Sequence, residues 1–373
     1  MTWIDAFAHA TDDEIPEPLI RRHPGETPPA GAKAIGLTSK RGNDGPLVSV
    51  VVPTFRDAGY LQDALHSVGA QTHQNVELVV VDSSDVEWIE AIAAECEWIR
   101  HIVTAPIGVA AARNEGISRA NGDFIALLDA DDFWHPEKLE RQLRGLSPDA
   151  TASYTSHYFV KFWGNETPQV KLRNRAPPEG SSAARAALTG AIYPHTSTLL
   201  FNKSAVSPRP FVQGIRNFED RLFAVELFRD HPPAFVEEPM AVRRLREGSL
   251  TDQQSRRVKT KHRLDAYDYV AQHYPDFRHI ARGRIAEECF SQGCHELEAN
   301  NAALARDYFT QCLVHSPAHV GALAMYLGSL VPRAMRSGIW SGVQALLRTR
   351  DRIRSGGDAG NREVEITESV PNP

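Results

Sequence analysis

Apolar residues in the first half of the chain fall into four short runs separated by polar loops. The runs are Leu47-Val-Ser-Val-Val-Val-Pro53, Val76-Glu-Leu-Val-Val-Val81, residues 99–103 and residues 124–128. Short runs that are rich in β-branched residues and bounded by turn residues are typical of buried strands. The pattern therefore predicts four strands within the first 130 or so positions of the sequence.

Helical patterns lie between these runs. Leu61, Leu65 and Val68 recur at the spacing of one helix face, and Gly108-Val-Ala-Ala-Ala-Arg-Asn-Glu-Gly116 is rich in residues that favour helix. Ser83 and Ser84 follow the second run, in a loop that could cap another helix. Alternation of buried strands with helices predicts an α/β fold, a mostly parallel sheet with helices on both faces.

Polar and acidic residues gather where the predicted strands end. Pro53-Thr54-Phe55, Asp82 and Asp129-Ala130-Asp131 each follow a run. Because ligands of such sheets bind beyond the carboxyl ends of the strands, these residues are expected to converge on one edge. No GxGxxG follows the first strand and no GxxxxGK[ST] occurs. The edge is therefore predicted to bind a nucleoside diphosphate through a metal and side chains.

The fourth run ends in three carboxylates, Asp129, Asp131 and Asp132. Alternation along an extended chain would place Asp129 and Asp131 on one face. Two carboxylates there suit Mg²⁺ or Mn²⁺ that is also held by substrate phosphates. The alternative is a solvated acidic turn that caps the next helix, and Pro136 followed by Glu137 is typical of such a helix start.

Composition limits the protein class. The chain has 373 residues, enough for two domains, with 24% charged and 42% hydrophobic residues, as in soluble globular proteins. A net charge of -6 argues against general nucleic-acid binding. The four cysteines form no CxxC pair and no signal peptide is visible, so a reducing, cytoplasmic location is expected.

Five stretches, in order, resemble the family 2 inverting glycosyltransferases, which have the GT-A fold. They are Val48-Ser-Val-Val-Val-Pro-Thr-Phe55, Gln71-Thr72, Val79-Val-Val-Asp-Ser-Ser84, Gly108-Val-Ala-Ala-Ala-Arg-Asn-Glu-Gly116 and Asn121-Gly-Asp-Phe-Ile-Ala-Leu-Leu-Asp-Ala-Asp-Asp132. The resemblance covers roughly residues 47–145. It implies the GT-A nucleotide-diphospho-sugar transferase fold and a nucleotide-sugar donor.

The resemblance also implies roles for individual residues on the donor side. Pro53, Thr54 and Phe55 would line the base and ribose pocket, Asp82 would face the nucleoside, Arg113 would reach the diphosphate, Ala130 would lie against the donor, and Asp131 and Asp129 would hold Mn²⁺ or Mg²⁺. From the residues alone, Arg113 could instead be a solvated helix charge. UDP is the expected nucleotide, but Ser83 stands where many members carry an acid that reads uracil, so another base is possible.

A second acidic place lies in Gly214-Ile-Arg-Asn-Phe-Glu-Asp220, before a helical pattern at Leu222, Val225 and Leu227. The family carries a Glu-Asp pair here, so the resemblance implies that Asp220 is the catalytic base and that Glu219 lies at the donor site. A sugar hydroxyl is a weak acid that needs such a base as it attacks the anomeric carbon. The alternative is an acid pair that caps a helix.

Further stretches extend the resemblance past the acidic turn. Residues 154–160 and 195–201 are expected to be strands on the acceptor side. Pro239-Met-Ala-Val-Arg-Arg-Leu-Arg-Glu-Gly-Ser-Leu-Thr251 resembles a family stretch in which a His is usual where Arg246 stands. Arg243, Arg244 and Arg246 could grip the diphosphate, or could form a charged loop.

The sequence predicts four parts. Residues 1–45 form an extension or linker, 46–254 the GT-A domain, 255–355 a helical region and 356–373 a disordered tail. Within the helical region, the spacing of Gly293, Ala305, Phe309, Cys312 and Pro317 resembles one tetratricopeptide-type helix pair. Residues 334–354 have the pattern of a basic amphipathic helix, which could lie on an anionic membrane or pack on the domain.

Three functions are compatible with these features. The first is an inverting transfer of sugar from a nucleotide sugar, most readily a UDP-sugar, to a hydroxyl of a saccharide or lipid-linked acceptor. The resemblance implies that such a transfer takes place in bacterial surface-polysaccharide or glycolipid synthesis. The enzyme could then contact the membrane peripherally through residues 334–354. The second is a nucleotidyltransferase, which would carry a Gly-rich loop after the first strand, and the third is a non-catalytic scaffold. The presence of Asp129, Asp131 and Asp220 together favours the first.

Overall fold

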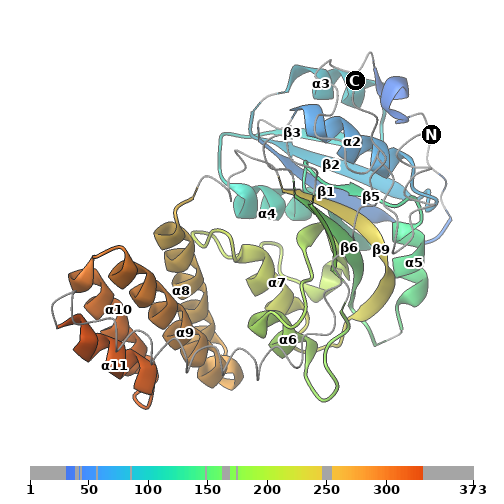
Figure 1. Cartoon of the computed structure of the whole chain (residues 1–373). Helices are drawn as coiled ribbons and strands as arrows, with labels where there is room; N and C mark the ends of the chain where they lie inside the picture. The colour runs from blue at the N-terminus through green and yellow to red at the C-terminus, as the bar shows by residue number, and fades with distance from the viewer. Residues whose placement is uncertain are drawn as a thin grey trace, which may run out of the picture. The chain divides into compact units, whose positions relative to one another are not determined.

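The computed structural model describes residues 31–37, 42, 44–55, 58–84, 86–147, 149–161, 169–173, 175–245 and 254–330 (Figure 1). The chain divides into two compact units. One holds the described residues up to Gly214 and from Glu219 to Leu245, and the other holds Ile215–Phe218 and residues 254–330. The predicted domain limits stay predictions, since residues 1–30 and 331–373, with the expected basic helix and tail, lie outside the description.

The predicted parallel strands are present. They are β1 (Val48–Thr54), β2 (Val76–Asp82), β3 (Ile99–Val103) and β4 (Phe124–Leu127), and all their mutual pairings are parallel. In the described part of the chain the sheet order is β3-β2-β1-β4-β8-β6-β9-β5, with β7 paired to β6. The α/β fold class is therefore confirmed, and the carboxyl ends of β1, β2 and β4 meet at one edge.

The remaining strands make the sheet mixed. They are β5 (Phe133–Trp134), β6 (Ala152–Lys161), β7 (Gln169–Arg173), β8 (Leu200–Asn202) and β9 (Ala234–Leu245). The predicted strand at residues 195–201 is wrong in its first half, where Thr196–Thr198 form a 3-10 turn, η3. The turn has a local cause. The His195 ring accepts a hydrogen bond from the Ser197 N–H, which bends the backbone out of the extended form.

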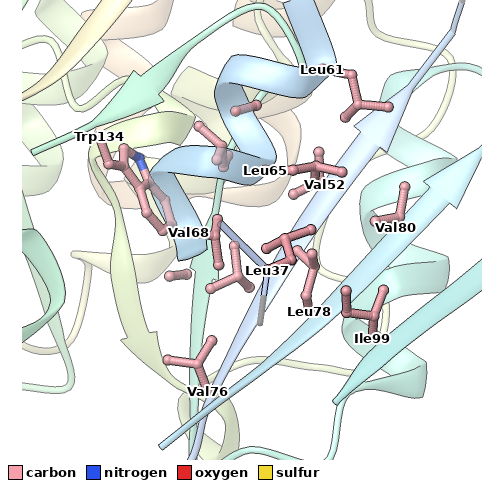
Figure 2. Packing of buried hydrophobic residues seen from close by; sticks show 14 of the residues in the cluster. Leu37, Val52, Leu61, Leu65, Val68, Val76, Leu78, Val80, Ile99 and Trp134 are labelled. Carbon is pink, nitrogen blue, oxygen red and sulfur yellow. The ribbon is translucent and has the colours of Figure 1, made fainter. Parts of the chain in front are cut away.

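Helices cover both faces of the parallel strands. On one face, α2 (Ala58–Gly69) packs Leu61, Leu65 and Val68 against the strands, as Figure 2 shows. Ile89 and Ile92 of α3 (Glu87–Glu95) belong to the same buried cluster. On the other face lies α4 (Val109–Arg119), where Gly116 contacts Val51 and Val81. The other helices of the first unit are α5 (Lys138–Gly145), α6 (Ala183–Thr189) and α7 (Glu219–Leu227), with short 3-10 turns η2 (Ala32–Ile35) and η4 (Lys203–Ala205).

The second unit is helical, as the sequence predicts. Its elements are α8 (Arg256–His273), η5 (Pro275–Phe277), α9 (Arg278–Glu298), α10 (Ala302–His315) and α11 (Val320–Ser329). The expected helix pair is α9 and α10, which approach so closely that a Cβ at Gly293 would lie 2.6 Å from Phe309 Cε1. Among the described helices, none has the length and apolar character needed to cross a bilayer.

Gly116→Ala tests the close approach of α4 to β1. The added Cβ would lie 2.3 Å from Val51 Cγ1, inside the core between helix and strand. We expect the free energy of unfolding to fall by about 1–3 kcal/mol, the usual cost of overpacking. Urea denaturation of the purified protein measures it. The control is Gly145→Ala at the end of α5, where the nearest atom would be 3.9 Å away, and an unchanged Gly116→Ala protein would contradict the close contact.

Candidate active site

The chain turns immediately after β4. Leu128 N–H still donates to Val51 O at 3.1 Å, but the Asp132 N–H donates back to Asp129 O at 3.0 Å. The backbone is therefore not extended from Asp129 to Asp132, and strand alternation does not govern these side chains. The turn instead places Asp129 and Asp132 together, with His195 of the segment before η3 beside both.

Arg113 on α4 joins two distant acidic segments. Its Nη2 donates to Asp129 Oδ1 at 2.7 Å and its Nη1 to Glu219 Oε1 at 3.2 Å. The side chain is buried, and its guanidinium lies 5.3 Å from the centre of the Phe211 ring. Burial by itself would lower the pKa of Arg113, but Asp129 and Glu219 raise it, so the guanidinium is charged. The alternative of a solvated helix charge is excluded.

Neighbouring residues of α4 explain why Arg113 stands there. Asn114 donates from Nδ2 to Phe211 O at 2.8 Å and accepts from Phe211 N at 2.9 Å. This pair of bonds fixes the Phe211 ring under the guanidinium of Arg113. Gly116 lets the helix sit directly on β1 and β2. Residues 113–116 of α4 thus supply the buried cation, the hydrogen bonds that hold Phe211, and the close packing of the helix on the sheet.

Asp132, Ser197 and His195 form a buried polar group next to Asp129. Ser197 Oγ donates to Asp132 Oδ2 at 2.6 Å, and His195 Nδ1 lies 3.5 Å from the same oxygen. Burial, with Asp131 and Asp129 nearby, raises the pKa of Asp132 well above its ordinary value. Burial, together with Arg243, His157 and Arg113, lowers the pKa of His195 well below its ordinary value, so the imidazole is neutral.

These side chains could hold a divalent metal. One ligand atom from each of Asp129, Asp132 and His195 falls within 4.8 Å of the others. Carboxylate oxygens and a neutral imidazole nitrogen are suitable ligands for Mn²⁺, and carboxylates suit Mg²⁺. The donor set therefore fits a divalent cation. Asp131 does not belong to this group of three.

Asp131 lies on the β9 side of the turn, near Arg243 and Arg244. Burial and the Asp129 carboxylate raise the pKa of Asp131 to about 6, against the opposing effect of the two arginines. Arg244 is buried, bonds Asp63 Oδ2 at 2.8 Å, and lies over the rings of Tyr60 and Phe133. Its backbone N–H donates to Asp132 Oδ1 at 2.9 Å. Arg244 is thus a packed side chain and not part of a charged loop, and Arg246 lies outside the described residues.

Asp82 ends β2 in a fully buried position. One carboxylate oxygen accepts from the Ser84 N–H at 2.8 Å, and the other accepts from the Val86 N–H at 2.6 Å and lies 3.3 Å from His101 Nε2. Burial would raise the pKa of Asp82, but the hydrogen bonds from His101, Val86 and Ser84 lower it to about 2. The carboxylate therefore organises the loop after β2.

The predicted base-pocket residues stand beside Asp82. Pro53 and Thr54 end β1 and are buried, and Phe55 follows, half-buried. Thr54 O accepts from the Ser83 N–H at 3.0 Å, and the Ser83 and Thr104 hydroxyls are 2.9 Å apart. The structure thus brings the ends of β1 and β2 together, as parallel strands require.

Glu219 and Asp220 are the first two residues of α7. Glu219 is buried against Arg113, and its pKa is raised by burial and by Asp220 more than Arg113 lowers it. Asp220 is half-buried, and its Oδ1 accepts from the Arg221 N–H at 2.7 Å. The helix-capping alternative therefore describes part of what Asp220 does.

Several residues of the site were not predicted from the sequence. Thr196 Oγ1 donates to Asp129 Oδ2 at 2.9 Å, and Ser197 Oγ accepts from the Asp129 N–H at 3.1 Å. Behind them, Trp134 Nε1 donates to Ser197 O at 2.6 Å and Gln142 Nε2 to Thr198 O at 3.0 Å. The run of hydroxyl residues after His195 was the available signal, but it also fitted the alternation of a strand.

Asp82→Asn tests the charge of the β2 loop. A carboxyl group whose pKa falls from about 3.9 to about 2 on folding contributes about 2 kcal/mol of stability when ionised. That contribution is complete above the unfolded pKa and is lost as the pH falls toward 2. We expect Asp82→Asn to reduce the unfolding free energy by about 2 kcal/mol at pH 7 and by less at pH 3.5. Urea denaturation at both pH values measures the two differences, and Asp149→Asn at an exposed position is the control. A difference that does not depend on pH would refute the prediction.

Comparison with known proteins gives a family match for the part of the chain that holds most of this site. Residues 49–207 match the model of Glycosyl transferase family 2. One relative is TuaG of Bacillus subtilis, whose name describes it as a teichuronic acid biosynthesis glycosyltransferase. It is 36% identical over 118 residues, which make up 30% of this chain and 47% of TuaG. An uncharacterized glycosyltransferase of Haemophilus influenzae is 35% identical over 133 residues, 34% of this chain and 52% of that protein. The chain thus spans about half the length of these relatives.

Solved structures give the fold over a longer stretch. The crystal structure of S. aureus TarS 1-349 aligns with a TM-score of 0.52 at 15% identity, over 87% of this chain and 98% of that one. The same protein in complex with UDP-GlcNAc aligns with a TM-score of 0.53 at 16% identity, over the same shares. At such low identity the likeness concerns the fold. Residues 49–207 are thus similar to Glycosyl transferase family 2, and the chain has a fold like that of GT-A glycosyltransferases such as TarS.

Proposed function

We propose that this chain is an inverting glycosyltransferase that moves a sugar from a nucleotide-diphosphate donor, a UDP-sugar, to a hydroxyl group of an acceptor. The observation that carries the proposal is the bridge made by Arg113, which draws the Asp129 turn and the Glu219–Asp220 pair to one edge of a family 2 domain. A donor site and a base must lie this close for a single displacement. A scaffold has no need of such a bridge.

The donor side is assigned to the ends of β1, β2 and β4. Pro53, Thr54 and Phe55 with Asp82 would form the nucleoside pocket, and Ala130 would lie against the donor beside the acidic turn. The TarS structure with UDP-GlcNAc supports a UDP-sugar, since the two chains share a fold. Ser83 remains the feature that could admit another base.

The metal is assigned to Asp131 and Asp129, with Asp132 and His195 as further ligands within reach of Asp129. When bound, Mn²⁺ or Mg²⁺ would supply positive charge that stabilises the leaving diphosphate. The raised pKa values of Asp131 and Asp132 reflect carboxylates packed together in a buried place. A cation there would favour their ionised forms.

The transfer step needs one base and no nucleophile from the protein. The acceptor hydroxyl oxygen forms a bond to the anomeric carbon while the bond from that carbon to the diphosphate oxygen breaks. The hydroxyl proton passes to the Asp220 carboxylate, and the nucleoside diphosphate leaves. Attack from the face opposite the leaving group inverts the anomeric configuration. The ion pair between Arg113 and Glu219 would keep Asp220 at a fixed position beside the donor site.

The acceptor is assigned by class alone, as a saccharide or a lipid-linked saccharide. TuaG is described by its name as a teichuronic acid biosynthesis enzyme, which supports a setting in surface-polysaccharide synthesis. A cytoplasmic place, with peripheral membrane contact through residues 334–354, would bring the enzyme to a lipid-linked acceptor. No basic excess for nucleic acid is present in the sequence.

Asp220→Asn tests the base. The amide keeps the shape of the carboxylate but cannot take the proton, so we expect transfer to fall by about 100-fold or more. UDP binding should be unchanged, because Asp220 is assigned to the acceptor proton. Product formation from UDP-sugars and UDP titration calorimetry measure the two effects. Glu226→Gln on the same helix is the control, and full activity of Asp220→Asn would remove Asp220 from the mechanism.

Asp131→Ala and His195→Gln test the metal ligands. We expect UDP with Mn²⁺ to raise the melting temperature of the wild type more than UDP alone does, because a ligand that binds only the folded state stabilises it. Asp131→Ala should abolish the part that depends on Mn²⁺, whereas His195→Gln should reduce it less. Exposed Asp149→Ala is the control. The opposite order would assign the metal to Asp129, Asp132 and His195, and no shift with any nucleotide would favour the scaffold.

A further inference from the structure

Three residues spaced four apart, Trp134, Lys138 and Gln142, form a buried group next to the 3-10 turn η3. Each of them is 0% exposed. Trp134 ends β5, and Lys138 and Gln142 lie one turn apart on α5, on the same side of that helix. The buried group and η3 belong to the same compact unit. The proposed function assigns these side chains to neither the donor, the metal nor the transfer step, so it does not explain their burial.

Lys138 is the member of the buried group that costs stability. Its Nζ lies 4.1 Å from the centre of the Trp134 ring and donates to Gln142 Oε1 at 2.6 Å. Among the described residues no carboxylate offsets its charge, and burial lowers the pKa of Lys138 well below its ordinary value. A buried amine is tolerated only when its hydrogen bonds are made. An apolar side chain of similar length would avoid this cost, but it could not hold Gln142.

The hydrogen bond from Lys138 sets the orientation of the Gln142 amide. An ammonium group has donors only, so it pairs with the amide oxygen of Gln142 and not with the NH₂ group. The NH₂ group then donates to Thr198 O at 3.0 Å and to Ser153 Oγ at 3.2 Å. Without Lys138 the amide could rotate and place its oxygen against the Thr198 carbonyl, where neither atom could donate.

Trp134 holds the carbonyl of η3 that precedes Thr198. Its Nε1 donates to Ser197 O at 2.6 Å, and the indole nitrogen can act only as a donor. Trp134 and Gln142 thus bond two successive carbonyls of η3. Because peptide planes are stiff, two bonded carbonyls in a row restrict the path of such a short turn.

The hydroxyl groups of η3 contact the acidic turn after β4. Thr196 Oγ1 donates to Asp129 Oδ2 at 2.9 Å. Ser197 Oγ donates to Asp132 Oδ2 at 2.6 Å and accepts from the Asp129 N–H at 3.1 Å. A shift of the η3 backbone would therefore move both hydroxyls relative to the two carboxylates. Asp129 belongs to both candidate sets of metal ligands, so such a shift would alter the metal site in either case.

We propose that Trp134, Lys138 and Gln142 are positioning residues for the metal site. They hold the backbone of η3, and the hydroxyls of η3 orient the carboxylates of Asp129 and Asp132 toward a divalent cation. The inference rests on the proposed function, in which Asp129 is a metal ligand. Loss of a residue that orients a metal ligand typically costs about 10–100-fold in metal affinity. The three residues reach the acids only through η3, so their removal should weaken metal binding and leave metal-free nucleotide binding intact.

The test compares Gln142→Met with Leu139→Met. Both positions lie on α5 and are fully buried, but the Leu139 side chain belongs to the apolar cluster under the sheet. The EPR signal of free Mn²⁺ measures Mn²⁺ binding to the protein with UDP present, and calorimetry measures UDP binding without metal. We expect Gln142→Met to raise the Mn²⁺ dissociation constant about tenfold and to change the metal-free UDP dissociation constant by less than about twofold. Leu139→Met should change neither constant.

Two further variants test the other members of the buried group. Lys138→Met removes the donor that orients the Gln142 amide, and Trp134→Phe keeps an aromatic ring but removes the donor to Ser197 O. We expect each to raise the Mn²⁺ dissociation constant about three- to tenfold. Urea denaturation shows which variants are folded, and if Gln142→Met does not fold, Trp134→Phe decides by the same two measurements.

Three results would overturn the inference while the proposed metal site stands. They are wild-type Mn²⁺ affinity in the folded variants, an equal loss of Mn²⁺ affinity in Leu139→Met, and a loss of metal-free UDP binding that parallels the loss of Mn²⁺ binding. The last would indicate a general disturbance of the domain. A wild type that binds no Mn²⁺ when UDP is present would instead refute the proposed metal site, and this inference with it. The two failures are therefore distinguished by the wild-type measurement.

Discussion

The buried guanidinium of Arg113 is the interaction on which the acidic edge depends. It is the cation that contacts both Asp129 of the β4 turn and Glu219 of α7, two segments that no strand pairing joins. Removing one partner of a buried pair leaves an uncompensated charge, at a cost of about 3–5 kcal/mol. The position of α4 on the sheet, set by Gly116, therefore decides where the proposed donor site and the proposed base meet.

Apart from Arg113 and its two carboxylate partners, the acidic edge holds more negative than positive charge. The Arg244 guanidinium forms an ion pair with Asp63 on α2, so it compensates the carboxylates of the β4 turn only in part. Asp131 and Asp132 are left with raised pKa values, which means that the folded protein holds them as carboxylates only at a cost. A site of this kind is stabilised by a bound cation, and strongly perturbed acids in one place are typical of functional sites.

The sequence predicted the strands and helices well because buried parallel strands leave continuous apolar runs and α4 leaves a helical composition. It predicted the edge where Thr54, Asp82 and Asp129 meet for the same reason. It did not predict which acids lie together as possible ligands of one metal. The hydrogen bond from the Asp132 N–H to Asp129 O turns the backbone, so strand alternation no longer applies there. The 3-10 turn at Thr196–Thr198 was also missed, since three hydroxyl residues fit a strand as well as a turn.

The unpredicted turn η3 shows how a site can depend on residues far from its chemistry. Its backbone carbonyls at Ser197 and Thr198 are held by Trp134 and Gln142, and buried Lys138 lies 4.1 Å from the centre of the Trp134 ring and bonds Gln142. On this turn the Thr196 hydroxyl donates to Asp129 and the Ser197 hydroxyl donates to Asp132. The turn η3 is thus positioned by partners outside the acidic site, and single-sequence motifs do not record such partners.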